Sequence, residues 1–321
     1  MLKNFLKNHP VHKKVVPYLD VFFIYNPTLF FTVWVMISMG MYIFHNDTLL
    51  YPQWLTSVVN FKIICLFISL TFLIGAAFIK QQIIIYELDK EKNERSPLYI
   101  FISKERALNI INLSIGLSFF AILFTNIYNL FLSILLFFII NFYINNKYKS
   151  LKIYQQYFFL FFIIVLLIFN GYVVVLSHNS YFFSLVKIFN VELFLKIFFY
   201  ALAVSPIFIM IQILEFNNKF IFRFFSCLIM LIVFICSFIF NNPFLSISSI
   251  CSLPFLLYAL LRNFDKDLSR SVKYPLFIFN FFISTIYPYL FIPLILIFYI
   301  SKYYYWHRFD IHFPTFLVEN D

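Results

Sequence analysis

The sequence predicts an all-α protein that lies in a membrane, a polytopic bundle of about nine transmembrane helices. Hydrophobic residues make up 63% of the chain and charged residues only 12%, with a mean hydropathy of +0.89, whereas about 25% of the residues of a soluble domain are charged. Apolar stretches of about 18 residues or more recur along the whole length, and each can cross about 30 Å of hydrocarbon. We therefore expect one integral-membrane domain over residues 1–321.

Each apolar stretch is expected to be a helix, because a strand in lipid would leave its backbone N–H and C=O groups without hydrogen-bond partners. The expected spans are residues 20–44, 59–85, 107–124, 127–145, 155–176, 193–214, 220–240, 243–262 and 276–300. Prolines at positions 27, 206, 254, 288 and 293 lie inside these spans. They mark expected kinks, which membrane helices tolerate.

Lysine and arginine are distributed unevenly over the connections between these spans. In this assignment 19 of the 24 lie on one side of the membrane, before the first span and in the even-numbered connections. Cytoplasmic loops carry the excess of basic residues, so we expect the N-terminus and residues 86–106 in the cytoplasm, residues 301–321 on the opposite side, and a bacterial inner membrane as the location. This topology also explains the net charge of +10. No nucleic acid is expected as a partner, since the basic residues are not gathered on one soluble module.

Two polar clusters follow the second and the sixth spans. The first, residues 81–97, reads Gln-Gln-Ile-Ile-Ile-Tyr-Glu-Leu-Asp-Lys-Glu-Lys-Asn-Glu-Arg-Ser-Pro. In the second, Glu215 lies beside Asn217 and Asn218, so that three of four successive positions carry a side-chain oxygen. Oxygen atoms brought close together are the ligands that Mg²⁺ requires.

In their order and spacing these clusters resemble the two aspartate-rich motifs of the UbiA superfamily of intramembrane prenyltransferases. The first family motif, Asn-Asp/Gln-x-x-Asp-x-x-x-Asp, falls on Gln81, Gln82, Ile85 and Asp89, and the second, Asp-x-x-x-Asp, falls on Glu215 and Lys219. Shorter matches support the resemblance along the chain: Asn26-Pro27-Thr28, Asn93-Glu94-Arg95, Ile102-Ser103-Lys104-Glu105-Arg106-Ala107, Leu151-Lys152 and Asn263-Phe264-Asp265-Lys266-Asp267.

The resemblance implies a transferase that moves a polyprenyl group from a prenyl diphosphate donor to a small acceptor, an aromatic compound or a quinone precursor. In the family, both motifs face each other at the cytoplasmic mouth of a helical cavity and hold Mg²⁺, which binds the diphosphate while the prenyl tail lies toward membrane lipid. The residues that the resemblance implies as catalytic and as metal ligands are Asp89 and Glu215. Those implied for diphosphate binding are Arg95, Lys152, Lys219 and Arg223, and Gln81, Gln82, Asn93, Asn217 and Asn218 are further motif positions.

The chain departs from the family pattern at several ligand positions. Gln81 and Gln82 are neutral, Ile85 offers no polar atom, and Lys219 carries an ammonium group where the second motif has an aspartate. Because a hard cation needs several oxygen ligands, we expect weak Mg²⁺ binding. An ammonium group can instead sit on a phosphate directly as a point charge.

Two other interpretations stay open at the level of sequence. A non-catalytic protein of the same fold would bind an isoprenoid or quinone-like lipid without turning it over. An unrelated transporter would show charged residues near the middle of the bilayer or broken helices in repeated positions, and Pro206 is the main feature of that kind. The charged residues also have plain explanations, since Asp89 can be a solvated loop carboxylate and Lys219 or Lys152 a cytoplasmic loop cation.

Overall fold

The computed structural model describes residues 10–27, 30–48, 60–88, 102–147, 151–176, 191–213, 219–262 and 264–309. This part of the chain is helical throughout, without a strand, as the hydropathy predicts. The elements are α2 (Pro10–Phe23), α3 (Phe30–Thr48), α4 (Phe61–Leu88), α6 (Lys104–Ile122), α7 (Ile127–Asn146), α8 (Ile153–Leu176), α10 (Val191–Ile213), α11 (Lys219–Ile239), α12 (Pro243–Arg262), α13 (Asp265–Ile286), the 3₁₀ turn η4 (Pro288–Leu290) and α14 (Phe291–Phe309).

Seven of these helices are long and apolar enough to cross a membrane. They are residues Phe61–Glu87, Lys104–Ile122, Ile127–Asn146, Ile153–Leu176, Val191–Ile211, Phe220–Ile239 and Pro243–Arg262, with Phe30–Phe44 as a shorter apolar helix. Large apolar side chains on the outer faces of α6 and α11 stay exposed, for example Leu113 (63%), Phe120 (62%) and Phe238 (72%). Such faces suit contact with lipid rather than water.

The first and the last expected spans are wrong in their extent. Residues 20–44 are divided between the end of α2 and α3, and Asn26 in the break has a φ of 49°. Residues 276–300 are divided between α13 and α14, where Tyr287 leaves the helix with φ −119° and ψ 81° and η4 follows. Pro27 and Pro288 therefore mark breaks, whereas Pro206 and Pro254 lie inside α10 and α12 as expected.

The chain divides into two compact units. Unit 1 comprises residues 1–31, 68–121 and 289–321, and unit 2 comprises residues 32–67 and 122–288. The prediction of a single domain stays a prediction.

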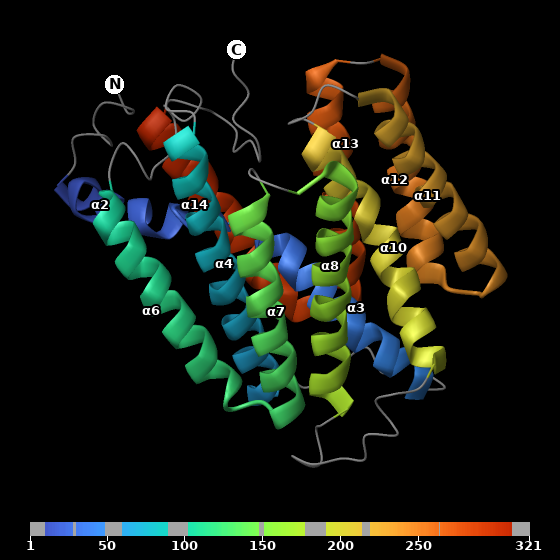
Figure 1. Ribbon diagram of the computed structural model, residues 1–321, viewed down its shortest axis with the longest axis horizontal. Helices are drawn as coiled ribbons and strands as arrows, with labels where there is room; N and C mark the ends of the chain where they lie inside the picture. Colours follow the sequence, from blue (N-terminus) through green and yellow to red (C-terminus); the bar gives the residue numbers. More distant parts are fainter. Residues whose placement is uncertain are drawn as a thin grey trace. The chain divides into compact units, whose positions relative to one another are not determined.

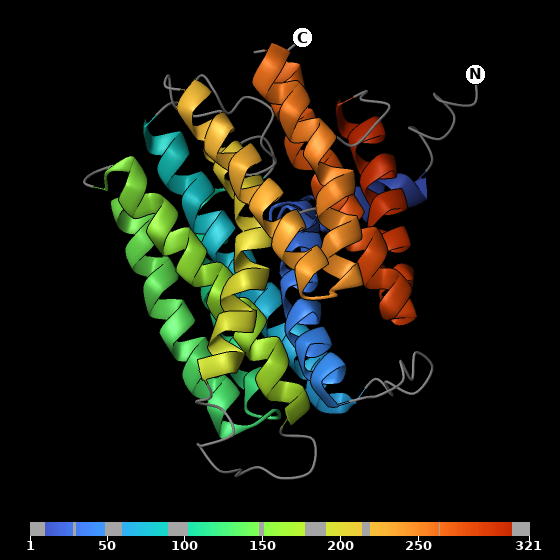
Figure 2. The ribbon, with the colours of Figure 1, turned by 90° about the vertical axis from the view of Figure 1, so that its right-hand side faces the viewer.

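Unit 2 is built from α3, α7, α8 and the helices from α10 to α13. Neighbouring pairs α7 with α8, α10 with α11, and α11 with α12 lie side by side (Figure 1, Figure 2), and α10 also contacts α8 and α13. Between α7 and α8, the Asn129 amide donates to the Asn170 carbonyl oxygen and to its Oδ1, both at 2.9 Å. Tyr42 of α3 packs against Phe244 of α12, with ring centroids 5.5 Å apart. Apolar and aromatic contacts between helices thus hold this unit, with a few buried amides that are hydrogen-bonded.

Unit 1 contains α2, most of α4, α6 and α14. The start of α6 packs on the end of α4 through a buried cluster of Ile24, Ala76, Ile79, Ile83, Ile102, Ala107 and Ile111. Helix α2 lies across the direction of α4 and α6 (Figure 1). It is tied to α14, because the Tyr304 hydroxyl donates to Asp20 Oδ1 at 2.9 Å and the Tyr304 ring stacks on Phe23 at 4.0 Å.

Candidate functional site

The first predicted motif begins on the last turns of α4, in unit 1. The helix continues through Leu88, so Gln81 and Ile85, four residues apart, lie on one face, and both side chains are half-buried. Glu87, near the end of α4, forms an ion pair with Lys104 at the start of α6, which joins these two helix ends. Asp89, Asn93 and Arg95 lie outside the described residues, and their roles stay predictions.

The second predicted motif precedes α11, in unit 2. Glu215, Asn217 and Asn218 lie outside the described residues, and Lys219 is described only as the first residue of α11. The resemblance implies that this motif meets the first one, which belongs to the other unit. That convergence stays a prediction.

Three of the cationic residues predicted from the sequence belong to neighbouring helix starts of unit 2. The Tyr157 ring of α8 packs on the Phe222 ring of α11, with centroids 5.2 Å apart. Lys152 directly precedes α8, and Lys219 and Arg223 lie in the first two turns of α11. We call this region, defined by Lys152, Lys219 and Arg223, the cationic end of unit 2.

Arg223 is fully buried at 1% exposure. Its Nη1 donates to the carbonyl oxygen of Ala259 at 3.1 Å, in the last turn of α12. The last carbonyls of a helix lack donors within the helix and carry partial negative charge. The guanidinium group therefore stabilises the end of α12, a structural contact that sequence reasoning did not anticipate.

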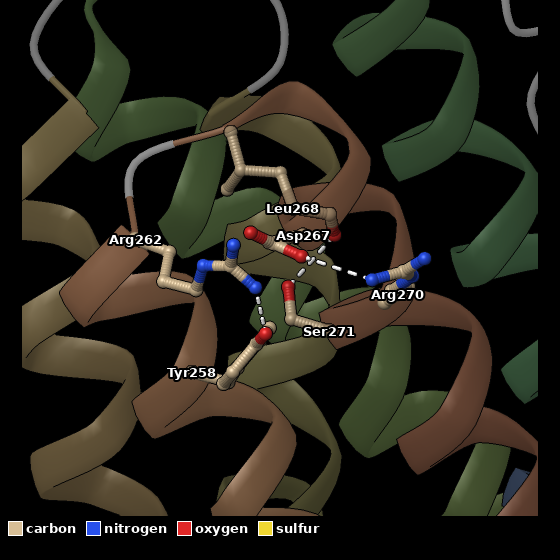
Figure 3. Close-up of polar contacts among 6 residues, drawn as sticks. All are labelled: Tyr258, Arg262, Asp267, Leu268, Arg270 and Ser271. Carbon is tan, nitrogen blue, oxygen red and sulfur yellow. Dashed lines mark hydrogen bonds and ion pairs between the residues drawn. The ribbon is translucent and has the colours of Figure 1, made fainter.

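The turn from α12 to α13 adds two more arginines, whose side chains are drawn in Figure 3. The Arg262 guanidinium group lies over the rings of Tyr258 and Phe264, 4.9 and 5.6 Å from their centroids. Its Nη1 also donates a hydrogen bond to the Tyr258 hydroxyl (Figure 3). Asp267, 3% exposed, accepts from Arg270 Nη1 at 3.3 Å (Figure 3). Asp267 lies in the first turn of α13, where a negative charge is favourable. The acidic turn noted in the sequence thus has a structural role here.

The part of the chain that the structure describes does not fit a Mg²⁺ site. It contains no group of three or more His, Cys, Asp or Glu side chains that could hold a metal ion. Gln81, Gln82 and Ile85 offer two neutral amides and a hydrocarbon but no carboxylate. Hard cations require several oxygen ligands, so the described motif residues would not hold Mg²⁺ by themselves.

Sequence reasoning missed Gln156, which lies one turn after Lys152. Its side chain is 2% exposed, and its Nε2 donates to the carbonyl oxygens of Lys147 and Leu151 at 3.1 and 3.0 Å. The sequence did contain one signal for Gln156, its four-residue spacing from Lys152, because residues four apart lie on one helix face.

No protein-family model and no curated protein sequence matches this chain. Its structure, however, is similar to the apo structure of a UbiA homologue from Aeropyrum pernix K1, with a TM-score of 0.63 at 14% identity over 82% of this chain and 98% of that one. The chain has the UbiA fold. A structure described as digeranylgeranylglyceryl phosphate synthase in membranes is also similar, with a TM-score of 0.52 at 16% identity over 85% of this chain and 97% of the other. The similarity confirms the membrane-helical UbiA fold expected from the motif order.

The UbiA fold explains why both predicted motifs follow long apolar helices. It does not by itself assign an activity, because one fold hosts more than one function. The activity has to be argued from the residues at the candidate site.

Proposed function

We propose that this protein is a UbiA-type prenyltransferase, which transfers a polyprenyl group from a prenyl diphosphate to a small acceptor in the membrane. The observation that carries the proposal is the cationic end of unit 2 in a chain of this fold. A diphosphate needs cationic partners, and a prenyl tail needs an apolar environment such as lipid. The proposed acceptor is an aromatic compound or a quinone precursor.

In the proposed reaction, the bond between prenyl C1 and the diphosphate oxygen breaks and its electron pair leaves with the diphosphate. The remaining allylic cation forms a new bond to a nucleophilic atom of the acceptor, which then loses its proton. Lys152 and Lys219 would neutralise the charge that develops on the leaving diphosphate, as point charges. Arg95 is a further candidate for this role, and Arg223 holds the end of α12 beside them.

Asp89 and Glu215 are the proposed catalytic carboxylates and the proposed ligands of a weakly bound Mg²⁺. Only two carboxylates are available in the two motifs, because the other motif positions are occupied by Gln81, Gln82, Ile85 and Lys219. We propose that cationic side chains supply much of the charge that a fully ligated metal would otherwise supply.

The experiment that tests the proposal is diphosphate release from labelled prenyl diphosphates of several chain lengths. Membranes that contain the protein would be compared with empty membranes, with Mg²⁺ and with chelator, and with and without lipid extract as a source of acceptor. We expect slow release that depends on the protein and falls in Lys152→Ala. No release above empty membranes, at any chain length, would contradict the proposal.

A second function is favoured by Ile85 and Lys219, which remove two family carboxylates. It is a non-catalytic protein of the UbiA fold that binds an isoprenoid or quinone-like lipid. Saturable binding of a prenyl diphosphate with no diphosphate release would support this function over the first.

A further inference from the structure

The Gln156 side chain joins the two ends of the connection between α7 and α8. Its Nε2 donates to the carbonyl oxygen of Lys147, the C-cap residue of α7, and to that of Leu151, two residues before α8 begins. Both N–H groups of the amide are therefore used, one at each end of residues 148–150. A primary amide has two N–H donors on one nitrogen, so one side chain can hold both ends.

The geometry fixes the orientation of this amide. A flipped amide would place Oε1 against two carbonyl oxygens, which can only accept hydrogen bonds. In the orientation observed, Oε1 is buried and has no hydrogen-bond partner. A buried acceptor without a partner is unfavourable, and it offsets part of what the two hydrogen bonds contribute to stability. The net contribution of Gln156 to stability is therefore smaller than that of a fully satisfied buried amide.

The residue that this arrangement holds is Lys152. Its backbone N–H donates to Gln155 Oε1 at 2.9 Å, and its carbonyl oxygen accepts from the backbone N–H of Gln156 at 3.1 Å. Its neighbour Leu151 is bound both through the Gln156 amide and through its own N–H, which donates to the Asn146 carbonyl at 3.2 Å. The backbone at Lys152 is thereby fixed next to the start of α8, while its side chain stays exposed.

We propose that Gln156 is a positioning residue of the diphosphate site. It holds the backbone at Lys147 and Leu151 so that the adjacent Lys152 presents its ammonium group to the diphosphate. This inference rests on the proposed function. Gln156 acts through the backbone at Lys147 and Leu151 and does not touch the ligand. A backbone fixed before binding reduces the ordering that the ligand has to impose on it.

The test uses inorganic pyrophosphate as the probe and the full-length protein in lipid nanodiscs, with the dissociation constant measured by calorimetry. Gln156→Met has a similar length and no amide, so it removes both hydrogen bonds together with the unsatisfied oxygen. We expect it to weaken pyrophosphate binding about tenfold, the order of effect of ordering one long side chain on binding. The unfolding temperature should fall less than in the control variant below, because the unsatisfied oxygen is removed with the two hydrogen bonds.

The matched control is Asn129→Leu. Asn129 is also fully buried and also donates both amide N–H groups across the α7–α8 pair, but in the first turn of α7, far along that helix from Lys147. This variant should lower the unfolding temperature and leave the pyrophosphate dissociation constant unchanged.

A double mutant shows whether Gln156 acts through Lys152. In a Lys152→Ala background, Gln156→Met should cause no further loss of affinity, because the group that it positions is gone. The inference would be overturned by an unchanged dissociation constant in Gln156→Met, or by a full tenfold further loss of affinity in the Lys152→Ala background. In either case, pyrophosphate binding by the wild-type protein would leave the proposed function intact. If the wild-type protein binds no pyrophosphate, the proposed function fails, and the inference fails with it.

Discussion

Gly40 of α3 and Gly171 of α8 allow the two helix backbones to approach so closely that neither position has room for a methyl group. A Cβ atom at position 40 would lie 1.8 Å from the carbonyl oxygen of Ile168, and one at position 171 would lie 1.9 Å from that of Ile37. Small residues at such crossings are the usual way in which membrane helices pack, because lipid gives no hydrophobic drive for their association.

Gly40→Ala and Gly171→Ala should each destabilise the protein by about 3 kcal/mol, the upper end for overpacking, since the clash is with backbone that cannot rotate away. Thermal unfolding in detergent would measure the effect. Gly116→Ala is the control, because no atom lies within 4 Å of its Cβ position and alanine favours a helix by up to about 1 kcal/mol. Equal stability of Gly116→Ala and Gly40→Ala would contradict the crossing described here.

Tyr304→Phe should destabilise unit 1. The hydroxyl is the donor to Asp20, and both residues are buried, at 0% and 4% exposure. Removing a hydrogen-bond partner from a buried carboxylate costs about 1–3 kcal/mol, whereas the stacking on Phe23 is retained. Tyr299→Phe, at an exposed tyrosine of the same helix, should leave the unfolding temperature unchanged.

The same contact leads to a different prediction for the C-terminal segment. Tyr304 lies beside Asp20, and the neighbouring Ile24 packs with Ile83 at the end of α4 and Ile102 before α6. The start of residues 301–321 therefore lies beside the end of α2, and from this contact we predict that it is on the same side of the membrane as the N-terminal segment. The prediction of opposite sides treats residues 276–300 as one span, whereas α13 and α14 are two helices.

Cysteines introduced at Lys92 and Lys302 should be labelled by an impermeant reagent from the same side of sealed cells. The background would lack the native Cys65, Cys227, Cys236 and Cys251. Labelling from opposite sides would show that Tyr304 does not reach Asp20 in the membrane.

The sequence predicted the central helices within a few residues, because each is a continuous apolar run closed by polar residues. The expected spans 127–145, 155–176 and 243–262 correspond to α7, α8 and α12. The breaks near Asn26 and Tyr287 were expected only as kinks, because apolar residues continue on both sides of Pro27 and of Pro288. Proline did not distinguish them either, because Pro254 is accommodated inside α12 while Pro288 begins a 3₁₀ turn.

The candidate site was less predictable than the fold. The positions of Lys152 and Arg223 followed from motif spacing and loop charge, but the contact of Arg223 with Ala259 depends on how α11 and α12 pack. The role of Gln156 depends on a backbone path that brings two carbonyl groups to one amide. Neither contact leaves a signal in local sequence.

Arg223→Met should lower stability by about 2 kcal/mol, because a charged donor to a buried carbonyl is lost. Arg262→Met is the matched control on the neighbouring helix end. Arg262 is exposed and stacks on aromatic rings, so its loss should cost about 0.5–1 kcal/mol. A larger loss in Arg262→Met than in Arg223→Met would contradict the structural role assigned to Arg223.

The last prediction concerns the metal. Ile85 and Lys219 stand where the family motifs have aspartates, and the resemblance implies that both positions serve one metal site. The double variant Ile85→Asp, Lys219→Asp would add two carboxylates and remove an ammonium group that repels divalent cations. We therefore expect it to raise Mg²⁺-dependent diphosphate release above the wild-type level, whereas Ile85→Ala, Lys219→Ala should not, because it adds no ligand oxygen. Fast wild-type turnover that needs Mg²⁺ and is abolished by Asp89→Ala or Glu215→Ala would instead show that two carboxylates suffice, and the proposed weak metal site would be wrong.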